Sequence, residues 1–167
     1  MQLTHDQNQF SKRQFPITIV CDTITSPANV GAIFRAADAF GVEKVMFCGG
    51  IPDFGKRMRK TSRSTEQYVP FEVTQEETLQ AVEKLKEEGY TICAVEITAN
   101  SVPLNKVNFK DFAKVALVLG AENFGVNNAV LQISDVVTHI TMYGNNSSMN
   151  VAQALTIALY ESTNALG

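Results

Sequence analysis

The sequence predicts one α/β domain built on a mostly parallel sheet with helices on both faces. Short apolar runs alternate with stretches of helical spacing, which is typical of strand–helix–strand units. Val115–Leu119 has no polar residue, as expected for a strand buried on both faces. The 167 residues, 45% hydrophobic and 19% charged, suffice for one core. We expect a polar arm over 1–14 and a single domain over 15–167.

The first part of the domain is expected to hold two strands around one helix. Ile17–Cys21 and Lys44–Cys48 are the two apolar runs. Between them, Ser26 precedes Pro27, a pair typical of a helix start. Apolar residues then recur at helical spacing until Gly41, a typical stop. The predicted helix has about three turns and packs one face on the sheet.

A long loop is expected next, and it carries the one concentrated positive charge of the chain. Five cations fall within eight residues: Lys56, Arg57, Arg59, Lys60 and Arg63. The net charge of −3 argues against the broad positive field of proteins that bind nucleic acid by electrostatics alone. The cluster is therefore either an ordinary solvated loop or a local basic patch.

Further strands and helices follow the basic loop. Gln67–Val73 is expected to be a short extended segment. Thr74–Glu77 matches a capping box and predicts a helix that ends at Gly89. Thr91–Val95 is the next predicted strand, and a short helix through Leu131 is expected after the strand Val115–Leu119.

The chain is expected to finish with a strand, a polar run and a helix. Val136–Thr141 is the last predicted strand, and apolar residues from Val151 onward share one face of the final helix. Ser147, Ser148 and Asn150 lie where that helix begins, and they offer more polar groups than capping requires. A loop rich in Asn and Ser is nevertheless common without a function.

Cysteine and histidine usage predicts no metal site. Cys21, Cys48 and Cys93 are widely spaced and lie at or near the ends of apolar runs, so we expect buried, reduced thiols. His5 and His139 are far apart in sequence. The polar arm lacks the apolar core of a signal peptide, and no segment has the roughly 18 apolar residues of a membrane span. We expect a cytoplasmic protein.

Two polar features suggest a ligand. Glu122 lies between Gly120 and Gly125 just after a buried strand, where parallel sheets bind ligands, although the glycines could simply shape a turn around a solvated carboxylate. Gly31 and Arg35 are four residues apart on the first helix, so bare backbone beside a guanidinium could meet an anion. The alternative is a weak surface pair of Arg35 with Asp38 or Asp22.

Three motifs in order give the chain a family resemblance. They are Asn29-x-Gly31-x-x-x-Arg35, Leu119-Gly120-x-Glu122-x-x-Gly125, and Ile140-x-Met142 leading to Ser148-Met149-Asn150-Val151. Each motif alone is weak. Together they resemble the SpoU (TrmH-type) RNA ribose 2′-O-methyltransferases of the SPOUT superfamily, over residues 17–166.

The resemblance implies a fold and a cofactor that the general rules would not select. It implies a deep trefoil knot in the C-terminal part, although knots are very rare, and a homodimer with the active site near the subunit interface. It also implies S-adenosylmethionine as cofactor, held mostly by backbone groups. The implied cofactor-binding residues are Val95, Gly120, Ile140, Ser148 and Met149.

The implied reaction is methyl transfer to a ribose 2′-hydroxyl of tRNA or rRNA. Arg35 is the residue that the resemblance assigns to activation of the hydroxyl, either as a base or by stabilising the alkoxide, because a guanidinium rarely loses its proton. The supporting residues implied are Asn29, Glu122, Ser148 and Asn150. The basic residues from Lys56 to Arg63 would bind RNA phosphates.

Some residues depart from the family pattern. Lys60–Glu66 stands where many relatives carry a Gly-Ala pair, Met149 replaces the usual leucine, and Ala152 replaces a common serine. We expect a bare catalytic core, which favours tRNA over rRNA. The alternatives are a catalytically silent RNA-binding dimer and a domain for another nucleotide, which would lack Gly-x-Gly-x-x-Gly after its first strand.

Overall fold

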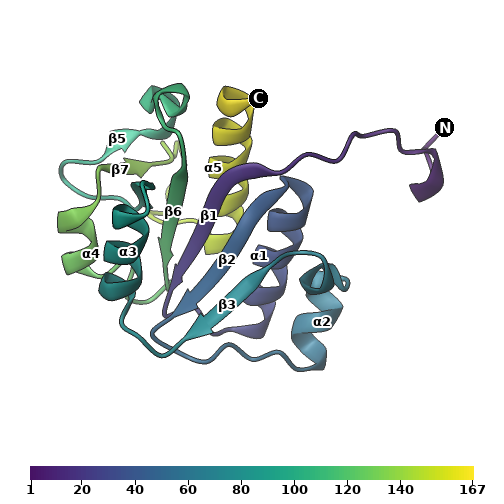
Figure 1. Ribbon diagram of the computed structural model, residues 1–167, viewed down its shortest axis with the longest axis horizontal. Helices are drawn as coiled ribbons and strands as arrows, with labels where there is room; N and C mark the ends of the chain where they lie inside the picture. The colour runs from purple at the N-terminus through teal and green to yellow at the C-terminus, as the bar shows by residue number, and fades with distance from the viewer.

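A seven-stranded sheet in the order β3-β2-β1-β6-β4-β7-β5 forms the centre of the molecule, and its strand pairs are all parallel (Figure 1). This computed structural model describes residues 1–167. The strands are β1 (Phe15–Asp22), β2 (Val42–Cys48), β3 (Phe71–Thr74), β4 (Thr91–Val95), β5 (Val102–Pro103), β6 (Val115–Gly120) and β7 (Val136–His139). The α-helices are α1 (Pro27–Ala39), α2 (Lys56–Ser62), α3 (Thr78–Glu87), α4 (Asn128–Ile133) and α5 (Val151–Leu166).

Helices cover both faces of the sheet, as predicted. Side chains of a strand alternate between the two faces. In β6, Leu117 packs into the core formed with α1 and α5, whereas Ala116 and Val118 pack into the core formed with α3 and α4. Neighbouring β1 divides in the same way, with Ile19 on one side and Val20 on the other. The unbroken apolar run of β6 therefore reflects burial on both faces.

Several predicted boundaries are confirmed. Ser26 is the N-cap residue of α1 and Pro27 its first residue, although the Ser26 side chain makes no capping hydrogen bond. Gly41 and Gly89 follow the ends of α1 and α3, and both have positive φ. Glycine adopts this left-handed conformation without the steric cost that other residues incur, and both glycines therefore mark helix ends reliably.

The predicted basic loop is wrong, because this segment forms helix α2. Lys, Arg and Met are good helix formers, and the buried Met58 anchors the short helix to the core. Asp53 Oδ1 also accepts a hydrogen bond from the N–H of Gly55, the N-cap residue, at 2.8 Å. Met58 is the one buried apolar residue among the seven of α2, so the hydrophobic pattern of this segment has no helical period. For that reason the sequence suggested a loop. The extended segment is shorter than predicted and begins at Phe71.

Two further predicted boundaries are also wrong. Thr74 was predicted to open a capping box, but it is the last residue of β3. Its Oγ1 accepts a hydrogen bond from Glu76 N at 3.1 Å, and α3 begins only at Thr78. The last strand stops at His139 instead of Thr141. The two-residue strand β5, which was not predicted, pairs with β7 no further than His139, and the ladder then ends.

Three residues other than glycine have positive φ: Thr23, Arg63 and Ser64. Arg63 (φ 53°, ψ 42°) and Ser64 (φ 66°, ψ 13°) are consecutive and follow the end of α2. The left-handed conformation costs roughly 1–2 kcal/mol for a residue with a Cβ atom. The turn after the basic helix therefore contains backbone strain at two adjacent positions.

The three cysteines are free and buried, as predicted. Burial raises the pKa of Cys93 to about 12. Burial also raises the pKa of Cys48 to about 12, with a smaller contribution from the negative charge of Asp22. The pKa of Cys21 is raised by burial and by nearby Cys48 and Asp22. All three thiols are thus kept protonated near neutral pH, so they should be poor nucleophiles.

We expect the three thiols to resist alkylation by iodoacetamide at pH 8 and to react together when urea unfolds the chain. Since an unfolded cysteine has a pKa of about 8.5, the thiols ionise first in the unfolded state. The free energy of unfolding should therefore be independent of these groups below that pH and fall as the pH rises toward 12. Mass spectrometry of labelled protein checks the first expectation, and urea titrations at pH 8 and 10 check the second. Rapid labelling of native protein would contradict the burial.

No helix is long and apolar enough to span a membrane. No group of three or more His, Cys, Asp or Glu side chains is placed to hold a metal ion. Residues 1–14 are exposed and precede the first strand of the sheet. Within this arm, Arg13 Nη1 donates a hydrogen bond to the carbonyl of Gly167 at 3.0 Å. The arm is therefore attached to the end of α5 just before β1 begins.

Candidate active site

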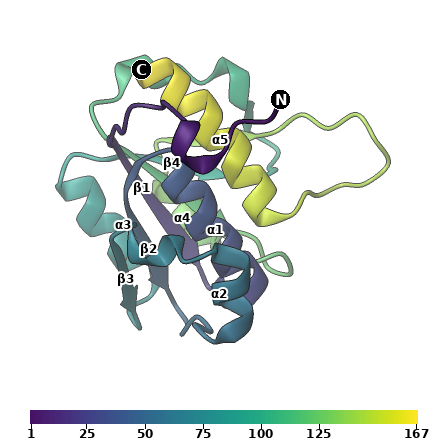
Figure 2. The ribbon, with the colours of Figure 1, turned by 90° about the vertical axis from the view of Figure 1, so that its right-hand side faces the viewer.

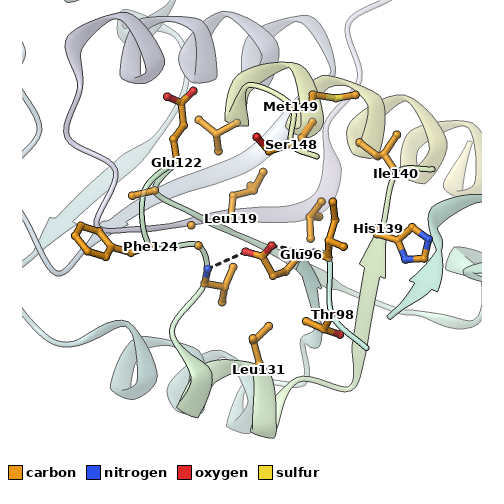
Figure 3. A pocket seen from close by; sticks show the side chains of 18 of the residues that line it. Glu96, Thr98, Leu119, Glu122, Phe124, Leu131, His139, Ile140, Ser148 and Met149 are labelled. Atoms are coloured by element: carbon orange, nitrogen blue, oxygen red, sulfur yellow. Dashed lines mark hydrogen bonds between the residues drawn. The ribbon is translucent and has the colours of Figure 1, made fainter. Parts of the chain in front are cut away.

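A cavity of about 650 Å³ lies at the carboxyl ends of β4, β6 and β7 (Figure 3). The loop over residues 140–150, which joins β7 to α5, closes one side of it. Figure 2 shows this loop extending from the body of the molecule before it returns to α5. The five residues implied for cofactor binding all line the cavity: Val95, Gly120, Ile140, Ser148 and Met149. The cavity therefore unites residues from four separate segments of the chain.

The two glycines of the second motif close a tight turn at the cavity wall. A Cβ atom on Gly120 would lie 2.0 Å from the carbonyl carbon of Gly125. Gly125 itself has a φ of +65°, and a Cβ there would lie 2.5 Å from Glu96 Oε2. The N–H of Gly125 also donates to the carbonyl of Ala121 at 2.7 Å. The glycines therefore shape a turn, and that turn forms one wall of the cavity.

Glu96 is a cavity residue that the sequence analysis missed. Its Oε2 accepts a hydrogen bond from Val126 N at 3.0 Å, and its Oε1 accepts one from Ile97 N at 2.8 Å. Glu96 thus ties the end of β4 to the turn after β6, and Figure 3 shows its carboxylate at the centre of the cavity. Its position directly after the apolar run Thr91–Val95 was the available signal, since ligands bind where parallel strands end.

Asp22 is a second carboxylate at this edge of the sheet, but it lies on the side of α3 and α4. It is 4% exposed, its Oδ1 accepts from Thr78 Oγ1 at 2.6 Å, and its Oδ2 accepts from Asn127 N at 2.8 Å. Asp22 therefore fixes the starts of two helices. The possible surface pair with Arg35 is wrong, because Arg35 forms no ion pair with Asp22 or Asp38.

Asn150 joins the three motifs. Its Nδ2 donates hydrogen bonds to Asn29 Oδ1 at 3.0 Å and to Glu122 Oε1 at 2.9 Å. Its Oδ1 accepts from the backbone N–H of Ala152 at 3.0 Å and of Gln153 at 3.3 Å, which caps α5. One amide therefore links the start of α1, the turn after β6 and the start of α5. Glu122 contacts the loop before α5 rather than Arg35.

Arg35 is exposed and makes no hydrogen bond or ion pair within the chain. It lies on α1 less than two turns beyond Asn29, so its guanidinium is free to meet a ligand near the Asn29–Glu122–Asn150 cluster. Ser148 is exposed and lines the cavity. The structure thus brings Asn29, Glu122 and Asn150 into contact and leaves the Arg35 side chain without a partner.

Gly31 has a different role from the one its spacing suggested. A Cβ atom on Gly31 would lie 2.6 Å from the carbonyl oxygen of Met58 and 2.8 Å from Thr61 Cβ. The glycine therefore lets α2 pack closely against α1, and no bare backbone is left for an anion. The five basic side chains on and just after α2 are exposed, and none of them forms an ion pair: Lys56, Arg57, Arg59, Lys60 and Arg63.

Comparison with known families decides the classification. Residues 16–160 match the SpoU rRNA Methylase family. The chain belongs to this family. A relative in Thermus thermophilus, a tRNA (guanosine(18)-2′-O)-methyltransferase, is 31% identical over 154 residues, which cover 90% of this chain and 75% of the relative.

Solved structures of SpoU proteins share the fold. The A. aeolicus TrmH/SpoU tRNA modifying enzyme superposes with a TM-score of 0.82 at 27% identity, over 92% of this chain and 77% of that one. The SpoU methyltransferase AviRb from Streptomyces viridochromogenes, in complex with the cofactor AdoMet, gives a TM-score of 0.76 at 25% identity, over 96% and 64% of the two chains. The α/β fold predicted from the sequence is therefore confirmed as the fold of SpoU proteins.

Substitution of Asn150 can separate its role as the N-cap of α5 from its contacts with Asn29 and Glu122. Serine is also a good N-cap residue, so Asn150→Ser keeps the cap of α5 but loses the contacts with Asn29 and Glu122. Asn150→Ala loses both and is expected to be about 1 kcal/mol less stable than Asn150→Ser. Urea unfolding measures this difference. Equal stability of the two variants would contradict the capping role.

Proposed function

We propose that this SpoU protein is an S-adenosylmethionine-dependent methyltransferase that acts on a ribose 2′-hydroxyl of RNA. The observation that carries the proposal is the junction at Asn150, where Asn29 and Glu122 meet beside the cavity. Three segments far apart in sequence thereby form one polar cluster beside the cavity, and one of them is the helix that carries Arg35. A merely structural α/β domain has no need for this arrangement at its surface.

The cavity fits the proposed cofactor. Its volume of about 650 Å³ lies within the range of about 300–1,000 Å³ that is typical of small-molecule sites. Leu119, Ile140 and Met149 supply apolar walls for an adenine and a thioether, and Gly120 lets the turn to Gly125 close tightly at the cavity wall. The proposed cofactor-binding residues are Val95, Gly120, Ile140, Ser148 and Met149. When bound, the cofactor supplies an electrophilic methyl group on a sulfonium.

The proposed role of Arg35 is to stabilise the 2′-oxygen as it becomes negative. A ribose hydroxyl is a weak nucleophile while it keeps its proton, so the site must favour the alkoxide. A guanidinium rarely loses its proton and therefore remains a cation that can bind the oxygen or an adjacent phosphate. Asn29, Glu122 and Asn150 would hold the loop around the reacting ribose, and Ser148 would contact the substrate or cofactor.

We further propose that the protein is a homodimer with a trefoil knot in its C-terminal part, as the family resemblance implies. Exposed apolar side chains on α5, Ile157 at 37% and Tyr160 at 58%, support the proposal of a subunit interface there. Sedimentation equilibrium should give twice the 18.3 kDa mass of the chain. A monomer at all concentrations would contradict the dimer.

The proposed substrate is tRNA, with rRNA as the alternative, and the proposed location of the enzyme is the cytoplasm. The decisive experiment incubates purified protein and labelled S-adenosylmethionine with separated tRNA and rRNA, and then maps the modified nucleotide. Label on a ribose 2′-oxygen of one RNA class supports the proposal. RNA binding without any transfer would favour a catalytically silent RNA-binding dimer instead.

The basic helix is proposed to be the phosphate-binding surface. Because Arg57, Arg59 and Lys60 are exposed and unpaired, their reversal to glutamate should weaken RNA binding strongly and flatten its dependence on salt. Filter binding at several KCl concentrations measures both quantities. The control reverses two cations, Lys106 and Lys110, which are exposed but distant from α2 in sequence. An equal loss of binding per reversed charge in the triple and the double variant would show a general charge effect rather than a specific surface.

A further inference from the structure

The turn after the basic helix has an unusual backbone. Arg63 and Ser64 both adopt the left-handed conformation, at the position where a helix typically ends with glycine. In this conformation the Cβ atom lies too close to the following carbonyl oxygen. Glycine at either position would therefore remove this steric cost from the folded state. Strain of this kind often occurs at functional sites, where the side chain is needed despite its effect on stability.

A set of hydrogen bonds holds this turn in place. The Ser62 side chain is fully buried, and its Oγ is hydrogen-bonded to the Glu66 carboxylate and accepts from Ser64 N at 3.3 Å. Thr65 Oγ1 donates to the carbonyl of Ser62 at 2.7 Å, and Arg63 N donates to the carbonyl of Arg59 at 3.0 Å. The left-handed backbone is therefore specified by the residues on either side of it.

The turn lies beside the helix that carries Arg35. A Cβ atom on Gly31 would lie 3.0 Å from Ser62 N, so the end of α2 rests directly on α1. Arg35 is one helical turn beyond Gly31 on the same face of α1. Figure 2 shows α1 and α2 side by side. The backbone of Arg63, the residue after Ser62, therefore lies next to the face of α1 that carries Arg35.

We propose that Arg63 binds an RNA phosphate next to the nucleotide whose ribose is methylated, and that its left-handed backbone exists to aim the guanidinium there. The proposal rests on the proposed RNA methyltransferase function and gives one residue of the basic cluster, Arg63, a defined position relative to the methylated nucleotide. Arg63 is exposed and has no ion pair, and a guanidinium binds phosphate oxygens through paired, charge-assisted hydrogen bonds. A glycine would relax the turn but would supply no cation.

The test compares Arg63→Gly with Ser64→Gly, since both relieve left-handed strain but only the first removes a charge. Thermal unfolding of both variants should shift upward by roughly 2–4 °C. Filter binding of unfractionated bacterial tRNA should weaken about tenfold for Arg63→Gly, and the slope of log K against log salt should fall by about one. Ser64→Gly should bind this RNA as the wild type does. Arg63→Lys should keep the wild-type salt slope, because it keeps the cation.

Each contrary result overturns a defined part of the proposal. Wild-type affinity and salt slope in Arg63→Gly would exclude the phosphate contact. Equal weakening in both glycine variants would assign the effect to the backbone rather than the guanidinium. A lower melting temperature in Arg63→Gly would show that the left-handed backbone is not strained. Failure of the wild-type protein to bind either tRNA or rRNA would instead overturn the proposed function itself.

Discussion

Arg35→Ala is expected to abolish methyl transfer while leaving cofactor binding and folding unchanged. The Arg35 side chain is exposed and makes no hydrogen bond or ion pair, so its removal takes no contact from the folded chain. Loss of one group that stabilises a developing oxyanion typically lowers the rate by about 10²–10³-fold. Radiolabel transfer to RNA, calorimetry with S-adenosylmethionine and thermal unfolding measure the three quantities separately.

Lys110→Ala is the matched control for Arg35→Ala. Lys110 is an exposed cation on the short turn Phe109–Asp111, outside both the cavity lining and α2, so its removal changes the net charge equally. Full activity in Lys110→Ala and none in Arg35→Ala would assign the loss to the position. Unchanged transfer by Arg35→Ala would remove Arg35 from the mechanism.

Arg35→Lys distinguishes electrostatic stabilisation from general base catalysis. If the cation stabilises the alkoxide, lysine should retain part of the activity near neutral pH, because it is still protonated there. If the side chain must accept a proton, the activity of Arg35→Lys should increase as the pH approaches the lysine pKa of about 10.4. We expect the first outcome, since guanidinium rarely gives up its proton.

The sheet was predictable from sequence where the local pattern decides the structure. Thr91–Val95 and Val115–Leu119 are apolar because both of their faces are covered, and Gly41 and Gly89 end helices because each needs a positive φ. Helix α2 was not predictable in this way. Its stability depends on close packing against Gly31 of α1, a contact between segments about 30 residues apart, and its own residues look like a solvated loop.

The candidate site was only partly predictable for a similar reason. The second motif predicted a possible ligand site at the end of a buried strand, at Gly120 and Glu122. The other cavity residues were predicted only by the family resemblance. Glu96 contacts a backbone N–H 30 positions away, and Asp22 contacts one 105 positions away. Such partners depend on the strand order, which places β6 between β1 and β4. No periodicity within a single segment encodes that order.

Gly120→Ala is expected to eliminate cofactor binding, because the second motif has no space for one additional methyl group. The new Cβ would lie 2.0 Å from the carbonyl carbon of Gly125 and 2.3 Å from Val126 N. The turn cannot simply move outward, since Glu96 Oε2 lies where a Cβ atom of Gly125 would be and accepts the N–H of Val126. Overpacking of this kind costs about 1–3 kcal/mol of stability. Calorimetry and urea unfolding measure the two effects.

Gly144→Ala is the matched control, because a Cβ on Gly144 would have no atom within 4 Å. It should bind the cofactor and unfold as the wild type does. The turn after β6 also carries Glu122, which accepts from Asn150, so displacement of the turn by Gly120→Ala should disturb the polar cluster as well as the cavity. Normal cofactor affinity in Gly120→Ala would mean that the turn can move without cost, and the cavity wall would then be less rigid than its contacts indicate.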